Sequence, residues 1–166
     1  MQIGFIGTGH ITKSVIFGIL GSKIKVNKII ISKRNHKISS TLKNKSKKIK
    51  VLNDNQKIID QSDWVFLSVT PEVGHKILPN LKFKKNQTII SFISTIKMKE
   101  LKKYTKLKSK IIRAIPLPPI SIRKGPVPIY PPNKNVKKFF DHLGTTVEIK
   151  NENLSLNFWS TSSMMA

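Results

Sequence analysis

Apolar residues gather in short runs along most of the chain, separated by longer segments of mixed polarity. Most of these runs are rich in β-branched residues and continuous rather than alternating, which is typical of strands buried on both faces of a parallel sheet. They cover residues 2–6, 28–32, 48–52, 64–69, 88–93 and 110–115. Segments long enough for crossover helices lie between them, at residues 11–20, 37–45, 56–61, 72–81 and 98–106. The repetition predicts an α/β fold with a doubly wound, mostly parallel sheet.

Prolines become frequent between residues 116 and 132. Because proline cannot donate a ladder hydrogen bond, this stretch is expected to form rigid loops with at most edge strands, such as residues 127–130. A helix over residues 135–143 and a strand over residues 145–149 follow. Gly144 stands between them and is a natural helix C-cap.

The last residues differ from the rest, because residues 152–166 are apolar and aromatic. They are typical of the first turns of a helix whose packing partners lie elsewhere. We therefore expect a first domain over residues 1–151 and the beginning of a helical second domain over residues 152–166, cut short at its end. An apolar segment with no face to cover it favours association of the chain.

The sequence has no cysteine and four histidines, at positions 10, 36, 75 and 142. This excludes a disulfide framework and a thiolate zinc site, and the scattered histidines predict no metal site. The longest apolar runs have about five residues, far below the roughly 20 that cross a bilayer. The N-terminus lacks the pattern of a secretion signal, so we expect a cytoplasmic protein without membrane association.

The chain carries 31 Lys+Arg against 8 Asp+Glu, a formal net charge of +23. Such a charge is typical of nucleic-acid binding proteins. However, specific contacts to phosphates and bases favour arginine, and the arginines here are Arg34, Arg113 and Arg123. We therefore expect no specific nucleic acid as a partner. Residues 1–53 contain no acid at all, so this third of the chain should attract an anionic ligand.

The strongest local motif runs from Gly4 to Thr12, after the first predicted strand and at the start of the first predicted helix. In this context it predicts a Rossmann-type dinucleotide-binding turn. Gly7 permits the tight turn, Gly9 lets the backbone approach a pyrophosphate, and the N–H groups that open the helix face that anion. The residues expected to bind the pyrophosphate are Gly7, Thr8, Gly9, His10, Ile11 and Thr12. A glycine-rich turn without a ligand is the alternative.

The end of the second predicted strand indicates which dinucleotide is bound. NAD sites place an acid here to accept hydrogen bonds from the ribose hydroxyls, whereas a 2′-phosphate needs neutral donors and a cation. This strand ends in Ser32, Lys33 and Arg34, with no acid nearby. The prediction is NADP(H) rather than NAD(H), with Ser32 and Arg34 on the 2′-phosphate. The alternative is that Lys33 and Arg34 only continue the basic composition of the chain.

Several segments together resemble the pyrroline-5-carboxylate reductase family over about residues 2–152. They are Gly4–Gly9, Ser32–Asn35, Asn55 ahead of Asp63, Val65–Pro71, Ile90–Thr95 and Ile112–Pro116. The resemblance implies an NAD(P)-dependent oxidoreductase that reduces the C=N bond of a cyclic imine, with proline as the product in the best-known members. It also implies a helical second domain that pairs two subunits into a homo-oligomer and contributes the substrate site.

The resemblance also assigns cofactor contacts beyond the glycine turn. The adenosine ribose and its phosphate would contact Ser32, Arg34, Asn35 and Asn55. The adenosine side of the crevice would be lined by Val69, Thr70 and Pro71. The nicotinamide ribose would contact Ser94 and Thr95. No catalytic residue is assigned, because a protonated imine is already electrophilic and needs mainly a correctly placed hydride donor.

The sequence departs from the family pattern at several positions. Thr70 replaces a common lysine, Leu117 replaces an asparagine, and residues 160–165 lack the family's glycines. These departures keep three hypotheses open: a reductase of pyrroline-5-carboxylate or a related imine, a non-catalytic module that senses NADP(H), and a relative of the hydroxyacid dehydrogenases. Without its helical domain, the chain is expected to bind the cofactor but not to reduce the imine.

Overall fold

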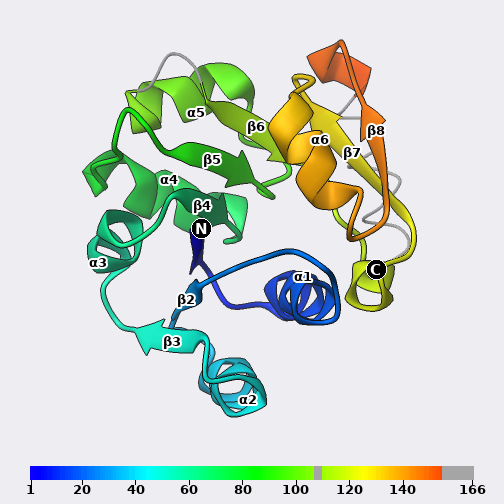
Figure 1. Cartoon of the computed structure of the whole chain (residues 1–166). Coiled ribbons are helices and arrows are strands. Elements are labelled where there is room, and N and C mark those ends of the chain that lie inside the picture. The colour runs from blue at the N-terminus through cyan, green and yellow to red at the C-terminus, as the bar shows by residue number, and fades with distance from the viewer. Residues whose placement is uncertain (107–109, 155–166) are drawn as a thin grey trace.

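The computed structural model describes residues 1–106 and 110–154. Within them the strands form a single twisted sheet in the order β3-β2-β1-β4-β5-β6-β7-β8 (Figure 1). The strands are β1 (Gln2–Ile6), β2 (Lys28–Ser32), β3 (Ile49–Leu52), β4 (Trp64–Leu67), β5 (Thr88–Ser91), β6 (Ile111–Ala114), β7 (Pro126–Tyr130) and β8 (Thr145–Glu148). All neighbouring strands in this part of the chain are parallel except β6 and β7, so the predicted doubly wound, mostly parallel sheet is confirmed.

Helices connect the parallel strands, as the sequence pattern predicts. They are α1 (His10–Leu20), α2 (His36–Lys45), α3 (Asn55–Asp60), α4 (Pro71–Ile77), α5 (Met98–Thr105) and α6 (Lys134–Phe140). The helix expected over residues 72–81 is shorter than predicted. It ends at Ile77 and continues as a 3₁₀ turn, Leu78–Asn80, because Pro79 interrupts the α-helical hydrogen-bond ladder.

The helices cover both faces of the sheet, and each face has its own apolar core. On one face α1, α2 and α6 pack against side chains such as Ile3 and Phe5 of β1. On the other face α3 and α5 pack against side chains such as Ile6 of β1 and Val65 of β4. The two faces alternate along each strand, as the pleat requires. This arrangement leaves the ends of the strands, rather than the faces of the sheet, to bind ligands.

The position of β7 differs from the prediction of an edge strand. It lies between β6 and β8, inside the sheet, although it contains Pro126 and Pro128. The carbonyl of Pro128 accepts a hydrogen bond from Ile115 N on the β6 side (3.0 Å), where the antiparallel pairing is short. The intervening residues pair with β8, for example through the Ile129 carbonyl, which accepts from Ile149 N. Proline has no N–H to donate, and Pro126 and Pro128 face β6. Because β7 forms few hydrogen bonds with β6, few are lost there.

Gly144 also has a different role from the predicted helix C-cap. α6 ends earlier, at Phe140, with Asp141 as its C-cap. A Cβ on Gly144 would lie 2.5 Å from the Gly125 carbonyl oxygen. The glycine is therefore required by the close approach of the backbone segments that precede β7 and β8.

The expected second domain falls mainly on residues 155–166, which lie outside the described residues. Only its first residues are described: residues 152–154 are helical, and Leu154 is 53% exposed. No helix in the described part of the chain is long and apolar enough to cross a membrane. The same residues contain no group of three His, Cys, Asp or Glu side chains placed to hold a metal ion.

Candidate functional site

The candidate site lies at the carboxyl ends of the parallel strands, where the sheet reverses its strand order. β1 lies between β2 and β4, and the connections after β1 and β4 lead to helices on opposite faces of the sheet. In doubly wound sheets this crevice is the usual ligand-binding position. The glycine turn follows β1, so the fold places it directly at this crevice.

Two hollows meet at this crevice. The β2 hollow has a volume of about 500 Å³ and is lined by Ile6, Gly7, Ser32, Lys33, Arg34, His36, Asn53, Asn55, Val69 and Ile77. The turn hollow has a volume of about 580 Å³ and is lined by Gly7, Thr8, Gly9, Arg34, Asn35, His36, Lys37, Ser68, Val69 and Thr70. Gly7, Arg34, His36 and Val69 line both, so the two hollows adjoin; together they are called the groove below. Of the described residues, none that lines either hollow is acidic.

Gly7 and Gly9 behave as the sequence motif predicts, for different reasons. Gly7 has φ +98°, and a Cβ there would lie 2.1 Å from the Ser68 carbonyl oxygen, so only glycine fits the turn. A Cβ on Gly9 would meet no protein atom within 4 Å. The fold therefore does not need a glycine at position 9, and the open space beside it is available to a ligand.

The start of α1 presents free backbone donors to this space. Gly9 is the N-cap of α1, no side chain caps the helix, and its first turn contains no acid. The N–H groups of the first helical residues, His10, Ile11 and Thr12, have no partner within the helix itself. Together with the helix dipole they favour an anion at this position. Of the predicted pyrophosphate contacts, Gly7, Thr8 and Gly9 line the turn hollow. His10, Ile11 and Thr12 line neither hollow and follow Gly9 directly as the first residues of α1.

Thr12 occupies the position of the third glycine in the motif, and its side chain is buried. Its hydroxyl donates to the Gly7 carbonyl (2.9 Å) and lies 2.8 Å from the Ser68 hydroxyl. These contacts join the glycine turn to the end of β4. Thr12 therefore fixes the shape of the turn with its side chain, and only its backbone N–H faces the open end of α1.

Ser32 lines the β2 hollow, but its hydroxyl already has partners in the protein. It accepts a hydrogen bond from Gly7 N (3.1 Å) and lies 3.0 Å from the Thr8 hydroxyl, which itself donates to the Ser32 carbonyl (2.6 Å). Ser32 and Thr8 are both buried. The pair connects the end of β2 to the glycine turn, a structural role that the sequence alone did not reveal.

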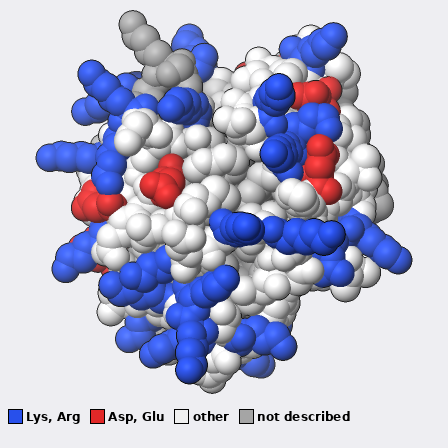
Figure 2. Space-filling view, viewed as in Figure 1, with Lys and Arg blue, Asp and Glu red and all other residues white. Residues whose placement is uncertain are grey.

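The exposed cations of the groove come from the loop between β2 and α2 and from the first turn of α2. Arg34 is exposed and lines both hollows, and Lys33 and Lys37 each line one of them. Figure 2 shows Lys and Arg side chains gathered over the lower part of this face, where α2 and β3 lie. Asn35 caps α2, since its side-chain oxygen accepts from Ile38 N (3.1 Å). The loop thus presents a local positive charge, with Arg34 at its centre.

Three of the other predicted residues, Asn55, Val69 and Thr70, line the groove, and Pro71 does not. Asn55 is half-buried at the start of α3 and lines the β2 hollow, beside Asn53 and His36, which sequence reasoning did not assign. Val69 lines both hollows and Thr70 lines the turn hollow; Pro71, the first residue of α4, lines neither.

Ser94 and Thr95 lie apart from the groove. They follow β5, line neither hollow, and are half-buried and exposed respectively. Because β5 is separated from β2 by β1 and β4, this loop is at the opposite end of the crevice from Arg34.

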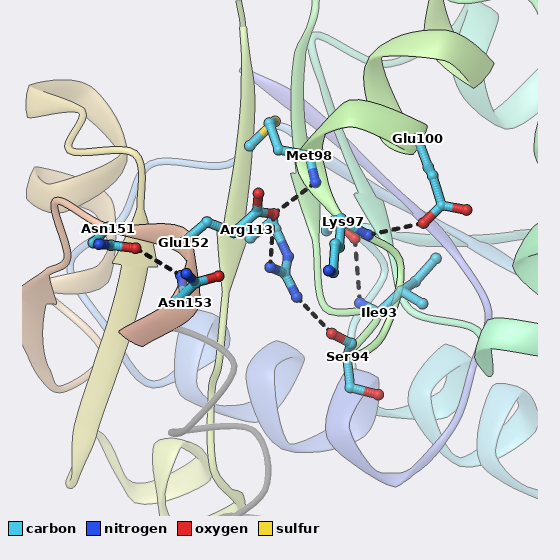
Figure 3. Close-up of polar contacts among 10 residues, drawn as sticks. Ile93, Ser94, Lys97, Met98, Glu100, Arg113, Asn151, Glu152 and Asn153 are labelled. Carbon is cyan, nitrogen blue, oxygen red and sulfur yellow. Dashed lines mark hydrogen bonds and ion pairs between the residues drawn. The ribbon is translucent and has the colours of Figure 1, made fainter.

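A buried arginine lies next to the Ser94 loop. Arg113 of β6 is 1% exposed, and its guanidinium donates to the Glu152 carboxylate (3.0 Å) and to the Ser94 carbonyl (Figure 3). Burial lowers the pKa of the Arg113 guanidinium below its ordinary value, while the Glu152 carboxylate opposes that shift. Sequence reasoning assigned no role to Arg113, although a lone arginine inside a predicted strand was a visible signal.

The remaining titratable candidates near the crevice have ordinary structural contacts. Glu72 forms an exposed ion pair with Lys76 (3.3 Å), and the His75 ring lies 2.8 Å from the Tyr104 hydroxyl. Neither lines the groove. Among the described residues, the titratable side chains that line the groove are Lys33, Arg34, His36 and Lys37, all of them exposed.

Known proteins resemble this chain in sequence. Residues 2–95 match the family described as "NADP oxidoreductase coenzyme F420-dependent". The pyrroline-5-carboxylate reductase of Arabidopsis thaliana is 26% identical over 123 residues, which cover 73% of this chain and 44% of that protein. The chain thus spans about half the length of the curated relatives it matches.

Solved structures of pyrroline-5-carboxylate reductases have the same fold. The enzyme from Streptococcus pyogenes matches with a TM-score of 0.79 and 24% identity, covering 98% of this chain and 62% of that chain. The enzyme from Plasmodium falciparum, solved with NADP bound, matches with a TM-score of 0.76 and 20% identity, covering 93% of this chain and 59% of that chain. The resemblance found in the sequence is confirmed, and the chain belongs to the family of NADP oxidoreductases described as coenzyme F420-dependent.

Proposed function

We propose that this chain binds NADP(H) across the crevice. The adenosine end occupies the β2 hollow, the pyrophosphate contacts the start of α1, and the nicotinamide end points toward Ser94 and Thr95. The observation that carries this proposal is the open space beside Gly9, because Gly9, at the start of α1, and the exposed Arg34 line the same turn hollow.

The donor set of the groove suits a 2′-phosphorylated cofactor. Among the described residues that line it there is no carboxylate to accept a ribose 2′-hydroxyl, whereas Arg34, Lys33 and His36 surround the end of β2. Arginine binds phosphate through two parallel hydrogen bonds, which makes Arg34 the main contact for the 2′-phosphate. Asn55 and Asn53 supply neutral donors in the same hollow. Ser32 supports the site through the glycine turn, because its hydroxyl is held by Gly7 and Thr8.

The reaction we propose is the reduction of a cyclic imine, such as pyrroline-5-carboxylate or a related compound. Its support is the similarity to pyrroline-5-carboxylate reductases in both sequence and fold. When bound, the cofactor supplies a hydride to the imine carbon. The residues of this chain bind and orient the cofactor, and the protonated imine nitrogen keeps its proton as it becomes an amine. No acid or base from the described residues is required for this chemistry.

We further propose that residues 1–151 form the cofactor-binding domain and that residues 152–166 begin a helical domain. In this proposal the helical domain pairs two subunits and contributes the groups that bind the imine. The support is that nine of the residues expected to contact the cofactor line the groove, namely Gly7, Thr8, Gly9, Ser32, Arg34, Asn35, Asn55, Val69 and Thr70.

Titration of the chain with NADPH and with NADH at one fixed salt concentration tests the cofactor. We expect NADPH to bind more tightly, because only its 2′-phosphate pairs with Arg34. Salt must be held constant because a chain of charge +23 attracts any polyanion. Equal affinities, or tighter binding of NADH, would contradict the proposal.

Oxidation of NADPH in the presence of pyrroline-5-carboxylate tests the reaction. The 166-residue chain is compared with the same chain joined to the part of the Streptococcus pyogenes enzyme that it does not match. We expect both to bind NADPH and only the joined protein to turn over the imine. Robust turnover by the 166-residue chain would show that the substrate site lies within these residues and that the proposed division of roles is wrong.

A further inference from the structure

The buried ion pair between Arg113 and Glu152 joins segments that are far apart in the sequence. The Arg113 Nη1 donates a hydrogen bond to the Glu152 carboxylate (3.0 Å), and its Nη2 donates one to the Ser94 carbonyl. The same carboxylate oxygen of Glu152 accepts from Met98 N (2.7 Å). Figure 3 shows the Arg113 guanidinium between the Glu152 carboxylate and the Ser94 carbonyl. One charge cluster therefore contacts β6, the loop after β5, the start of α5 and the segment after β8.

The cluster fixes both ends of the loop that follows β5. Ser94 lies near the beginning of this loop, and Met98 is the first residue of α5, where the loop ends. Arg113 contacts the first and Glu152 contacts the second. Because the guanidinium is planar and its donors have fixed directions, both contacts together allow only a narrow range of loop positions. Thr95, which is exposed, is held between these two attachment points.

An ion pair at this depth is an expensive way to stabilise a fold. The Arg113 side chain is 0% exposed and the Glu152 side chain 23% exposed, so both charges lose much of their hydration. Replacing such a pair with apolar side chains is often neutral or stabilising in other proteins. Stability alone therefore does not explain the pair, whereas the precise placement of the Ser94 carbonyl and of the α5 N-terminus does.

The loop after β5 lies on the side of the glycine turn opposite to Arg34. From the glycine turn at β1, Arg34 lies toward β2, and the Ser94 loop lies in the other direction, beyond β4. The two halves of a dinucleotide extend in opposite directions from the pyrophosphate. If the 2′-phosphate end contacts Arg34, the nicotinamide end reaches the carboxyl end of β5.

We propose that Arg113 and Glu152 are positioning residues that hold the loop at Ser94 and Thr95 in the conformation that receives the nicotinamide half of the cofactor. The inference rests on the proposed function. Neither side chain touches the cofactor in this arrangement: they act through the Ser94 carbonyl and the Met98 N–H. Glu152 also links the segment after β8 to the loop at Ser94 and Thr95, through Arg113 and Met98.

Two probes separate this role from a general structural one. NADPH has both halves of the cofactor, whereas 2′,5′-ADP has the adenosine half with its 2′-phosphate and no nicotinamide. Affinities are measured by calorimetry at fixed salt for Arg113→Met, Glu152→Gln and the double variant. We expect the Kd for NADPH to rise about tenfold or more, as when hydrogen bonds to charged groups are lost, while the Kd for 2′,5′-ADP stays within about twofold.

Matched controls come from exposed charges elsewhere in the chain. Arg123→Met removes an exposed arginine and changes the net charge as Arg113→Met does. Asp141→Asn removes the acid of the exposed Lys137–Asp141 pair and matches Glu152→Gln. We expect both controls to bind NADPH and 2′,5′-ADP like the wild type. A control that weakens NADPH as strongly as its partner variant would overturn the proposal.

The double variant keeps the test decisive if a single variant does not fold. It leaves no unpaired buried charge, which is the costly outcome of removing one partner. Equal weakening of both probes, or no weakening of NADPH, would overturn the positioning role. So would a wild-type chain that binds NADPH no more tightly than 2′,5′-ADP. A wild-type chain that binds neither probe would instead contradict the proposed function.

Discussion

The two ends of the crevice are built in different ways. At the β2 end, the charge comes from exposed side chains of one short loop, with Arg34 at its centre, and of the first turn of α2. At the β5 end, the charge is a single buried arginine, Arg113, held by Ser94 and Glu152 from distant parts of the chain. The first end presents charge at the surface, and the second uses charge to hold backbone in place. Substitutions at the two ends should therefore have different effects.

The largest effect is expected between the two ends, at the glycine turn. Gly9→Val should abolish binding of NADPH, raising its Kd by about a hundredfold or more, because the new side chain fills the space beside the α1 N-terminus. The fold should survive, since a Cβ there meets no protein atom within 4 Å. Calorimetry and thermal unfolding measure the two properties on the same sample.

Gly7→Val is the matched control for Gly9→Val. It should unfold or strongly destabilise the chain, because position 7 has φ +98° and a Cβ there would lie 2.1 Å from the Ser68 carbonyl oxygen. A folded Gly9→Val chain with normal NADPH affinity would show that the phosphates bind elsewhere.

At the β2 end, Arg34→Met should weaken NADPH about tenfold and leave NADH nearly unchanged, since a charge-assisted contact to the 2′-phosphate is worth about 1.5–3 kcal/mol. Arg123→Met removes the same charge from an exposed position outside the groove and should change neither affinity. Parallel titrations at one salt concentration measure the ratio of the two dissociation constants. An unchanged ratio in Arg34→Met would remove this residue from the cofactor site.

Ser32→Ala distinguishes a structural role from a ligand role at the same end. The Gly7 N–H and the Thr8 hydroxyl would lose a buried partner, which should lower the free energy of unfolding by about 1–3 kcal/mol. The ratio of NADPH to NADH affinity should stay the same. Urea unfolding and the two titrations provide the readouts, and a changed ratio with unchanged stability would restore Ser32 as a direct phosphate contact.

The smallest effect is expected far from the crevice, at Asp141. Burial by itself raises the pKa of this carboxyl, but hydrogen bonds from Lys137 and Thr146 outweigh it and hold the pKa below its ordinary value. The resulting stabilisation is present above the ordinary pKa and is lost as the pH falls through the lowered one. Asp141→Asn should therefore cost less than about 1 kcal/mol at neutral pH, as exposed ion pairs do.

Urea unfolding of Asp141→Asn and of the wild type over a range of acidic pH checks the sign of this effect. The difference in stability between them should shrink as the solution becomes more acidic. A difference that grows toward low pH would contradict the assignment.

The same comparison shows what the sequence could predict. The glycine turn, the end of β2 and the buried strands depend on neighbouring residues, so local patterns were enough to predict them. The internal position of β7 could not be predicted, because it depends on which side of the strand the donors of Pro126 and Pro128 would face. The Arg113–Glu152 pair was also missed, since its contacts join residues 39 positions apart.

Ser32 is an intermediate case. Its position at the end of β2 was predicted, and so was its closeness to the cofactor groove. Its partners were not, because the glycine turn returns to β2 only in the folded chain, where Gly7 and Thr8 come within hydrogen-bond distance of the Ser32 hydroxyl. Contacts that close over 24 or 25 residues do not appear in any local pattern.

A crystal structure of the chain with NADP⁺ bound tests the central claim most directly. We expect the 2′-phosphate within hydrogen-bond distance of Arg34, the pyrophosphate at the N–H groups of His10 and Ile11, and the nicotinamide ribose beside Ser94 and Thr95. A cofactor bound outside the crevice, or with its 2′-phosphate directed away from Arg34 into solvent, would contradict the account.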